Sequence, residues 1–183
     1  MIGIYISKSK EFIQLVADRR GDEKIIIKKC LEILSDHSGA HIISYSGSRF
    51  DERMLRNKFT EGRHNHSHLI FDDILIDLKA SLALPIPTYQ LGEVGDFFGY
   101  RFTHPNMSGQ EVASIYMRYS DNLRKFGGYE KLCTYNEDDV KSMLSLVEHL
   151  YQKTISSSTT ITAEKKPMKD FSTEGFEGIA ELL

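Results

Sequence analysis

The first half of the chain alternates short apolar runs with polar segments, and the second half repeats its apolar residues every three or four positions. Residues 2–7 (IGIYIS) and 11–17 (EFIQLVA) are β-rich runs separated by a short polar segment, which is typical of a β-hairpin. From residue 23 to residue 36 the spacing of the apolar side chains predicts a helix with one buried face.

Two later apolar runs, residues 41–45 and 70–78, predict buried strands, and the second is centred on residues 74–76. Between them we expect a helix that begins with acidic side chains at residues 51–52, followed by a polar loop over residues 62–68. The chain beyond the second run predicts helices, and the last of these has about four turns. Its apolar face is formed by Val140, Met143, Leu144, Val147 and Leu150.

The composition changes near residue 153. Residues 156–160 are all serine or threonine, and a Lys-Lys-Pro sequence follows, which predicts a linker. Residues 171–183 carry apolar side chains at helical spacing and predict a short amphipathic helix at the end of this tail. We therefore expect one domain over residues 1–153 and a tail over residues 154–183. The order of strands and helices predicts an α/β domain around one mixed sheet.

Composition narrows the classes of function. The chain has 183 residues, of which 40% are hydrophobic and 27% charged, with a net charge of −3, as in ordinary soluble globular proteins. No run approaches the roughly 20 apolar residues that span a bilayer, and the first residues lack the layout of a secretory signal, so we expect a cytoplasmic protein without a membrane partner. Its two cysteines do not make a disulfide framework or a zinc site. Without a positive net charge, a nucleic acid site would need a local basic patch.

Two acidic positions are candidates for chemistry. Asp51 follows a predicted strand and a glycine-containing turn, at the edge of the sheet where α/β proteins place their sites. Tyr135 and Asp139 are four residues apart where the last helix is expected to begin, so they can share one helix face. A phenol beside a carboxylate is suited to holding an attacking water next to a divalent metal. The alternative is that Asp51 caps a helix and that Asp139 complements the helix dipole.

Together these segments resemble the DEDD-type 3'–5' exonucleases. The sequence YSGSRFDERML at residues 45–55 is similar to their second motif, Tyr-Asn-Gly-x-x-Phe-Asp, with Ser46 in place of asparagine. The sequence YNEDDV at residues 135–140 is similar to the tyrosine variant of their third motif, Tyr-x-x-x-Asp. ILIDL and LGEVGDFFGYRF resemble elements of the RNase H-like predicted ribonuclease branch. The resemblance covers about residues 1–152, and the proofreading domains of family B DNA polymerases share this plan.

The resemblance implies an RNase H-like mixed sheet flanked by helices and a metal-dependent reaction on DNA or RNA, at a single strand or a 3' end. In that superfamily four carboxylates hold two divalent ions, usually Mg²⁺ or Mn²⁺. Asp51 and Asp139 would be metal ligands and Tyr135 would orient the attacking water, so all three would be catalytic residues. Asp77 matches a family position to which we give a supporting role.

One part of the family pattern has no counterpart. These nucleases begin with a central strand that carries Asp-x-Glu, and residues 1–7 contain no acid, so two of the four ligands are missing. Without that strand the hairpin and the strand at residues 41–45 would have unpaired edges. Three explanations remain open: Met1 is an internal start, another polypeptide supplies the strand, or the sheet closes in a different way.

Two hypotheses of function follow. The first is a nuclease of the 3'–5' exonuclease type, and the alternative is a catalytically inactive module that binds nucleic acid or a protein partner. Such a partner would supply the missing strand or bind the C-terminal tail. Among the other candidates, we interpret the alternating His64, His66 and His68 as a solvated loop rather than a metal site. Arg118, Arg124 and Lys125 could face a nucleic acid, or could simply lie on a polar helix surface.

Overall fold

The computed structural model describes residues 1–103, 107–158 and 179–180. Its sheet has the strand order β2 (Glu11–Leu15), β1 (Ile2–Ile6), β5 (Ile179–Ala180), β3 (His41–Ser44) and β4 (Ile70–Asp73). The strands β1 and β2 form the predicted antiparallel hairpin, and β3 and β4 are parallel. The mixed sheet of an α/β domain is therefore confirmed.

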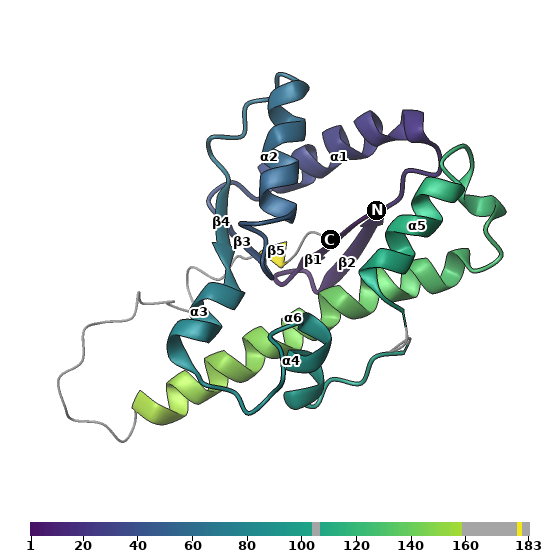
Figure 1. The fold of residues 1–183 in the computed structure, drawn as a ribbon. Coiled ribbons are helices and arrows are strands. Elements are labelled where there is room, and N and C mark those ends of the chain that lie inside the picture. The colour runs from purple at the N-terminus through teal and green to yellow at the C-terminus, as the bar shows by residue number, and fades with distance from the viewer. Residues whose placement is uncertain (104–106, 159–178, 181–183) are drawn as a thin grey trace.

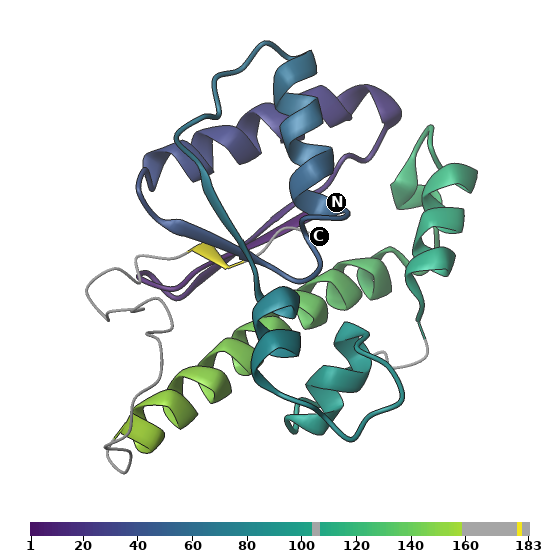
Figure 2. The same ribbon diagram turned by 60° about the vertical axis from the view of Figure 1, so that its left-hand side comes forward.

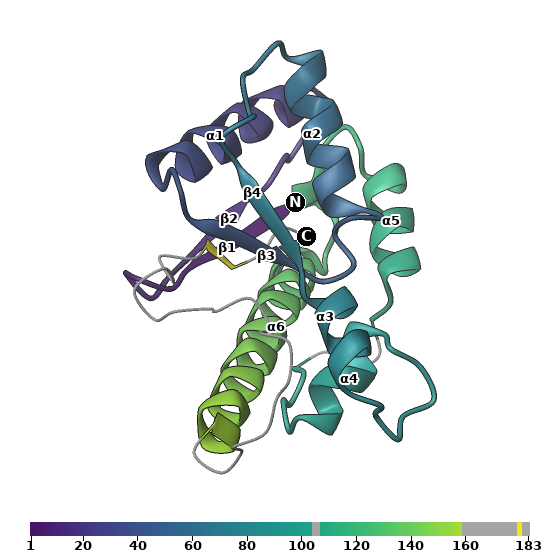
Figure 3. The same cartoon turned by 90° about the vertical axis from the view of Figure 1, so that its left-hand side faces the viewer.

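Helices cover both faces of this sheet (Figures 1 and 3). The helices α1 (Glu23–Asp36) and α2 (Asp51–Glu61) lie on one face, and α6 (Tyr129–Ser158) runs across the other. Neighbouring residues of β3 point to opposite faces because side chains alternate along a strand. Ile42 accordingly packs in the apolar cluster of α1 and α2, whereas Ile43 packs in the cluster that contains Met143 and Leu146 of α6.

Shorter elements complete the domain. The helices α3 (Ile74–Ser81) and α4 (Leu91–Phe97) follow β4, and α4 packs against α6. Next come α5 (Gly109–Arg118) and a short 3₁₀ helix, η2 (Leu123–Lys125), while another, η1 (Arg20–Asp22), precedes α1. None of the described helices is both long enough and apolar enough to cross a membrane.

Gly3 allows α6 to lie directly against β1. A Cβ atom at this position would stand 2.7 Å from Cγ2 of Val140 and 2.8 Å from Oδ1 of Asn136. Such distances are shorter than real Cβ contacts, so any larger residue would push the helix away from the sheet. The close approach fixes the turn of α6 that carries Asp139.

The central position of the sheet is occupied by β5. This strand is antiparallel to β1 through Tyr5 and Ile6, and parallel to β3 through Ile42 and Ile43. Figure 2 shows it in yellow between the hairpin and β3. The edges that we expected to be unpaired therefore receive a strand from the same chain, at a position where the sequence pattern predicted an amphipathic helix. Open strand edges offer backbone hydrogen bonds that outweigh the marginal stability of a short helix. The rest of that predicted helix lies outside the described residues.

Two further predictions were wrong in their extent. The strand expected over residues 70–78 ends at Asp73, and α3 begins at Ile74, because the Asp73 carboxylate accepts a hydrogen bond from the backbone N–H of Leu75 (3.1 Å) and caps the helix. The last helix has 30 residues, about eight turns, because it begins at Tyr129. It also continues through the expected boundary at residue 153 to Ser158.

Candidate active site

The turn between β3 and α2 presents Asp51 at the carboxyl end of β3. Ser46 has a positive φ of 61° in this turn. Gly47 packs so closely on β3 that a Cβ atom would lie 1.9 Å from Oγ of Ser44. Phe50 occupies the N-cap position and makes no side-chain cap, so Asp51 is the first helical residue rather than the predicted cap.

Asp73 at the end of β4 holds this turn in place. The backbone N–H groups of Ser46 and Ser48 donate to its carboxylate at 2.8 and 3.2 Å, and the Ser48 hydroxyl donates at 2.6 Å. Asp73 was not among the predicted site residues, and Asp77 was expected to have the supporting role. Asp77 lies on α3 with an exposed side chain. The signal that could have identified Asp73 is an acid at the carboxyl end of a short strand that pairs in parallel with β3.

Three adjacent acids on α6 have different surroundings. Glu137 forms an ion pair with Lys141 one turn later. Asp138 is buried and accepts hydrogen bonds from the Tyr100 hydroxyl (3.1 Å) and the backbone N–H of Thr103 (2.7 Å). Asp139 is also buried, with 9% of its surface exposed. All three lie well inside a helix that begins at Tyr129, so the interpretation that they complement its dipole is wrong.

The Asp139 and Asp51 carboxyl groups lie close enough to influence each other. Burial is the main cause that raises the pKa of Asp139 to about 7; the charges of Asp138 and Asp51 act in the same direction, and a hydrogen bond from Tyr135 acts in the opposite one. Burial also raises the pKa of Asp51 to about 7, and the charge of Asp73 contributes. Two carboxyl groups thus share a partly desolvated region, and no basic side chain of the described residues contributes to either pKa shift.

Tyr135 completes this group. Its phenol forms a hydrogen bond with Asp139, one helical turn later. Burial and the Asp139 charge raise the pKa of Tyr135 well above its ordinary value. The phenol therefore remains protonated at neutral pH and acts as a donor to the carboxylate or to a water molecule. The structure thus brings the three predicted site residues together from the start of α2 and from one face of α6.

The donor set fits one divalent cation. Mg²⁺ and similar ions are often held by one or two protein carboxylates, with substrate phosphate and water completing the coordination. Asp51 and Asp139 supply two such carboxylates, and their raised pKa values indicate that a positive charge between them would be stabilising. Within the described parts of the chain, no group of three or more histidine, cysteine or acidic side chains is arranged to hold a metal. These residues do not fit the two-ion site of four carboxylates.

Among the remaining candidates, His66, His68 and Arg124 make structural contacts. His66 and His68 lie in the predicted polar loop, where Nδ1 of His66 is 3.1 Å from the carbonyl oxygen of His64 and Nε2 of His68 is 3.1 Å from Oγ of Ser35. Arg124 pairs with Asp18 and lies over the ring of Tyr129, 4.8 Å from its centroid. Arg118 and Lys125 are exposed.

Comparison with known proteins adds one finding. A family model described as the RNase_H superfamily matches residues 1–151. The matched segment contains β1 to β4 and most of α6, including the turn that carries Asp139. No curated protein and no solved structure matches the chain.

Proposed function

The chain belongs to the RNase H superfamily, and we propose that it is a metal-dependent nuclease of the 3'–5' exonuclease type. Membership of the superfamily indicates a nuclease-type function and a nucleic acid partner at a coarse level. The finer proposal rests on one observation. The half-buried Asp51 and the buried Asp139 have carboxyl groups whose pKa values are both raised to about 7, the Asp51 charge acts on Asp139, and the Tyr135 phenol is hydrogen-bonded to Asp139.

In this proposal Asp51 and Asp139 would hold a divalent cation, Mg²⁺ or Mn²⁺, beside a phosphodiester group of DNA or RNA. RNase H-like nucleases generally use such ions. The cation supplies positive charge that stabilises the charge developing on the phosphate. Because Asp139 is almost fully buried, its attraction for a cation is much less screened than it would be at the surface.

Tyr135 has a separate role. It remains a neutral donor in the relevant pH range because its pKa is raised, so it does not remove a proton from water. Its hydrogen bond with Asp139 fixes the direction of the phenol, which can then orient a water molecule toward the phosphate. We expect Tyr135→Phe to lower the cleavage rate while leaving the affinity for the cation almost unchanged.

Asp73 and Asp138 are positioning residues. Asp73 fixes the turn that carries Asp51 through its bonds to Ser46 and Ser48. Asp138 ties the segment after α4 to α6 through Tyr100 and Thr103, beside Asp139. The substrate therefore meets carboxylates held by rigid elements rather than by a free loop.

The test is cleavage of single-stranded DNA or RNA labelled at its 5' end, in the presence of Mn²⁺. Wild type should shorten the strand from its 3' end, and Asp51→Asn and Asp139→Ala should abolish the shortening. Glu137→Gln is the matched control, because Glu137 is adjacent on α6 and pairs with Lys141. Activity that persists in Asp139→Ala would refute the site. A folded wild type that binds the strand without cutting it would support the inactive binding module instead.

A further inference from the structure

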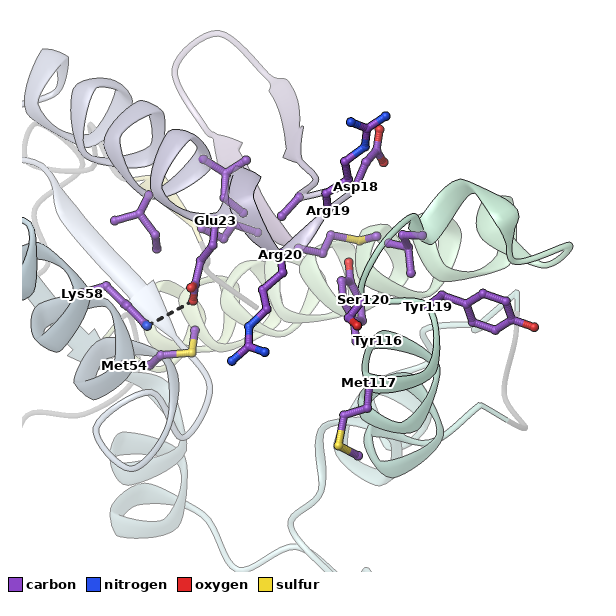
Figure 4. Close-up of a pocket in the computed structure, with 16 residues that line it drawn as sticks. Asp18, Arg19, Arg20, Glu23, Met54, Lys58, Tyr116, Met117, Tyr119 and Ser120 are labelled. Atoms are coloured by element: carbon purple, nitrogen blue, oxygen red, sulfur yellow. Dashed lines mark ion pairs between the residues drawn. The ribbon is translucent and has the colours of Figure 1, made fainter.

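A pocket opens at the same edge of the sheet as Asp51. Its volume is about 650 Å³, and its walls come from the start of β1, from η1 and α1, and from α2 and α5 (Figure 4). Both β1 and β3 pair with β5, β1 antiparallel and β3 parallel. The first residues of β1 and the last residues of β3 therefore lie at the same end of the sheet, which places the pocket on the side where the carboxyl groups are.

The helix α2 connects the pocket to the candidate active site. Asp51, Met54 and Lys58 are spaced by three and four residues, so they form one stripe along this helix. Met54 and Lys58 line the pocket. Three residues advance a helix by about 4.5 Å, which is comparable with the step of about 3.4 Å between nucleotides along one strand of B-DNA.

Arg20 gives the pocket an available positive charge. Its guanidinium group points into the space between Met54 and Met117 in Figure 4, and it forms no ion pair or side-chain hydrogen bond with any residue that the structure describes. Lys58 differs, because its ammonium group is paired with Glu23 across the pocket at 3.2 Å. A ligand with a single negative charge near Arg20 fits this arrangement.

The walls on both sides of Arg20 are apolar but exposed. Met54 of α2 is 46% exposed and Met117 of α5 is 75% exposed. Thioether side chains make favourable contacts with aromatic rings, so two methionines that line the same pocket suit a flat aromatic ligand.

We propose that this pocket binds the nucleotide next to the scissile phosphate, with its base between Met54 and Met117 and its phosphate on Arg20. The inference rests on the proposed function, because the phosphate that lies at Asp51 and Asp139 defines which nucleotide reaches the pocket. It specifies an unpaired strand as the ligand, since a base can enter only when it is free of a complementary strand.

The first experiment measures binding without cleavage. A fluorescent single-stranded oligonucleotide of ten nucleotides is titrated in EDTA with wild type, Arg20→Gln and the matched control Arg118→Gln. Arg118 is exposed on α5, but it does not line the pocket. Arg20→Gln should weaken binding about tenfold and lower the salt dependence of the affinity by about 0.7 in log–log slope, whereas Arg118→Gln should change neither. Equal affinities for Arg20→Gln and wild type, or no binding by wild type, would overturn the proposal.

The second experiment tests the base. An oligonucleotide with an abasic site one position from its 3' end should bind wild type several-fold more weakly than the intact strand. The double variant Met54→Ala/Met117→Ala should no longer discriminate between the two strands, and an unchanged discrimination would overturn the assignment of the base. Because neither experiment needs cleavage, an inactive protein with these effects would refute the proposed function alone. An active protein without them would refute the pocket alone.

Discussion

Neutralising Asp139 should make the protein more stable, although the same change should abolish its proposed activity. The charged form of a carboxyl group whose pKa rises from 3.8 to about 7 on folding is destabilised by roughly 4 kcal/mol. In Asp139→Asn the charge is removed, and the amide oxygen can still accept the hydrogen bond from Tyr135. Removing the charge therefore removes this destabilisation, but a buried amide N–H group without an acceptor offsets about 1–3 kcal/mol of the gain. We expect a net gain of about 2 kcal/mol in the free energy of unfolding.

This gain should depend on pH in a defined direction. Below about pH 4 the carboxyl group is protonated in both the folded and the unfolded protein, so its raised pKa has no effect on stability. Between pH 4 and pH 7 the unfolded state loses its proton first, and the destabilisation grows until it is complete above pH 7. At pH 4.5 the electrostatic destabilisation is only about 1 kcal/mol, so the cost of the buried amide should leave Asp139→Asn about 1 kcal/mol less stable than wild type. The net gain of about 2 kcal/mol should be reached at pH 8.

The measurement is thermal or urea unfolding at both pH values in EDTA. A gain of 2 kcal/mol should raise the unfolding temperature by about 4–8 °C at pH 8. Asp121→Asn is the control, because Asp121 is exposed before η2 and its neutralisation should leave stability unchanged. A gain of equal size at pH 4.5 and pH 8, or a loss at pH 8, would show that the charged form of Asp139 does not destabilise the folded protein.

Three other measurements depend on the same geometry of the site. The affinity of wild type for Mn²⁺, measured by calorimetry, should rise about a hundredfold from pH 6 to pH 8, about tenfold for each of two carboxyl groups, because protons compete with the cation for groups whose pKa values are about 7; a flat profile would exclude Asp51 and Asp139 as ligands. Gly47→Ala should lower the free energy of unfolding by about 1–3 kcal/mol and reduce cleavage, because the new Cβ would lie 1.9 Å from Oγ of Ser44. Gly109→Ala, at a position with open space around the Cβ, is its control, and equal stabilities of the two variants would contradict this account. Asp73→Ala should cost about 2–3 kcal/mol in urea unfolding and weaken Mn²⁺ binding, because it leaves the Ser46 and Ser48 N–H groups without their acceptor; unchanged Mn²⁺ affinity would show that the turn does not position Asp51.

The spacing of apolar residues predicted the elements that pack against segments close to them in the sequence. The hairpin of β1 and β2 and the helix over residues 23–36 appear as expected, because their apolar spacing has one interpretation. The run from Ile70 to Leu78 has two interpretations, since a short apolar run suits a buried strand or a buried helix. The Asp73 side chain decides between them by capping α3, and periodicity does not register a cap of this kind.

The candidate site was predicted in part for a related reason. Asp51, Tyr135 and Asp139 belong to short local motifs, so the sequence alone could nominate them. Asp73 acts on a turn 25–27 residues earlier in the chain, and its importance depends on β3 and β4 ending side by side. Arg20 and Met117 meet at one pocket from elements about a hundred residues apart, which no local pattern indicates.

The central place of β5 has a consequence for how the protein folds. The pairing of Tyr5 and Ile6 with Ile179 and Ala180 joins segments more than 170 residues apart, and such contacts form late because closing a long loop costs entropy. A nascent chain can build the hairpin and pack α1 against it while the neighbouring edges of β1 and β3 are still open. Those edges are templates for pairing with other molecules. The interval before β5 docks is therefore the period in which aggregation competes most strongly with productive folding.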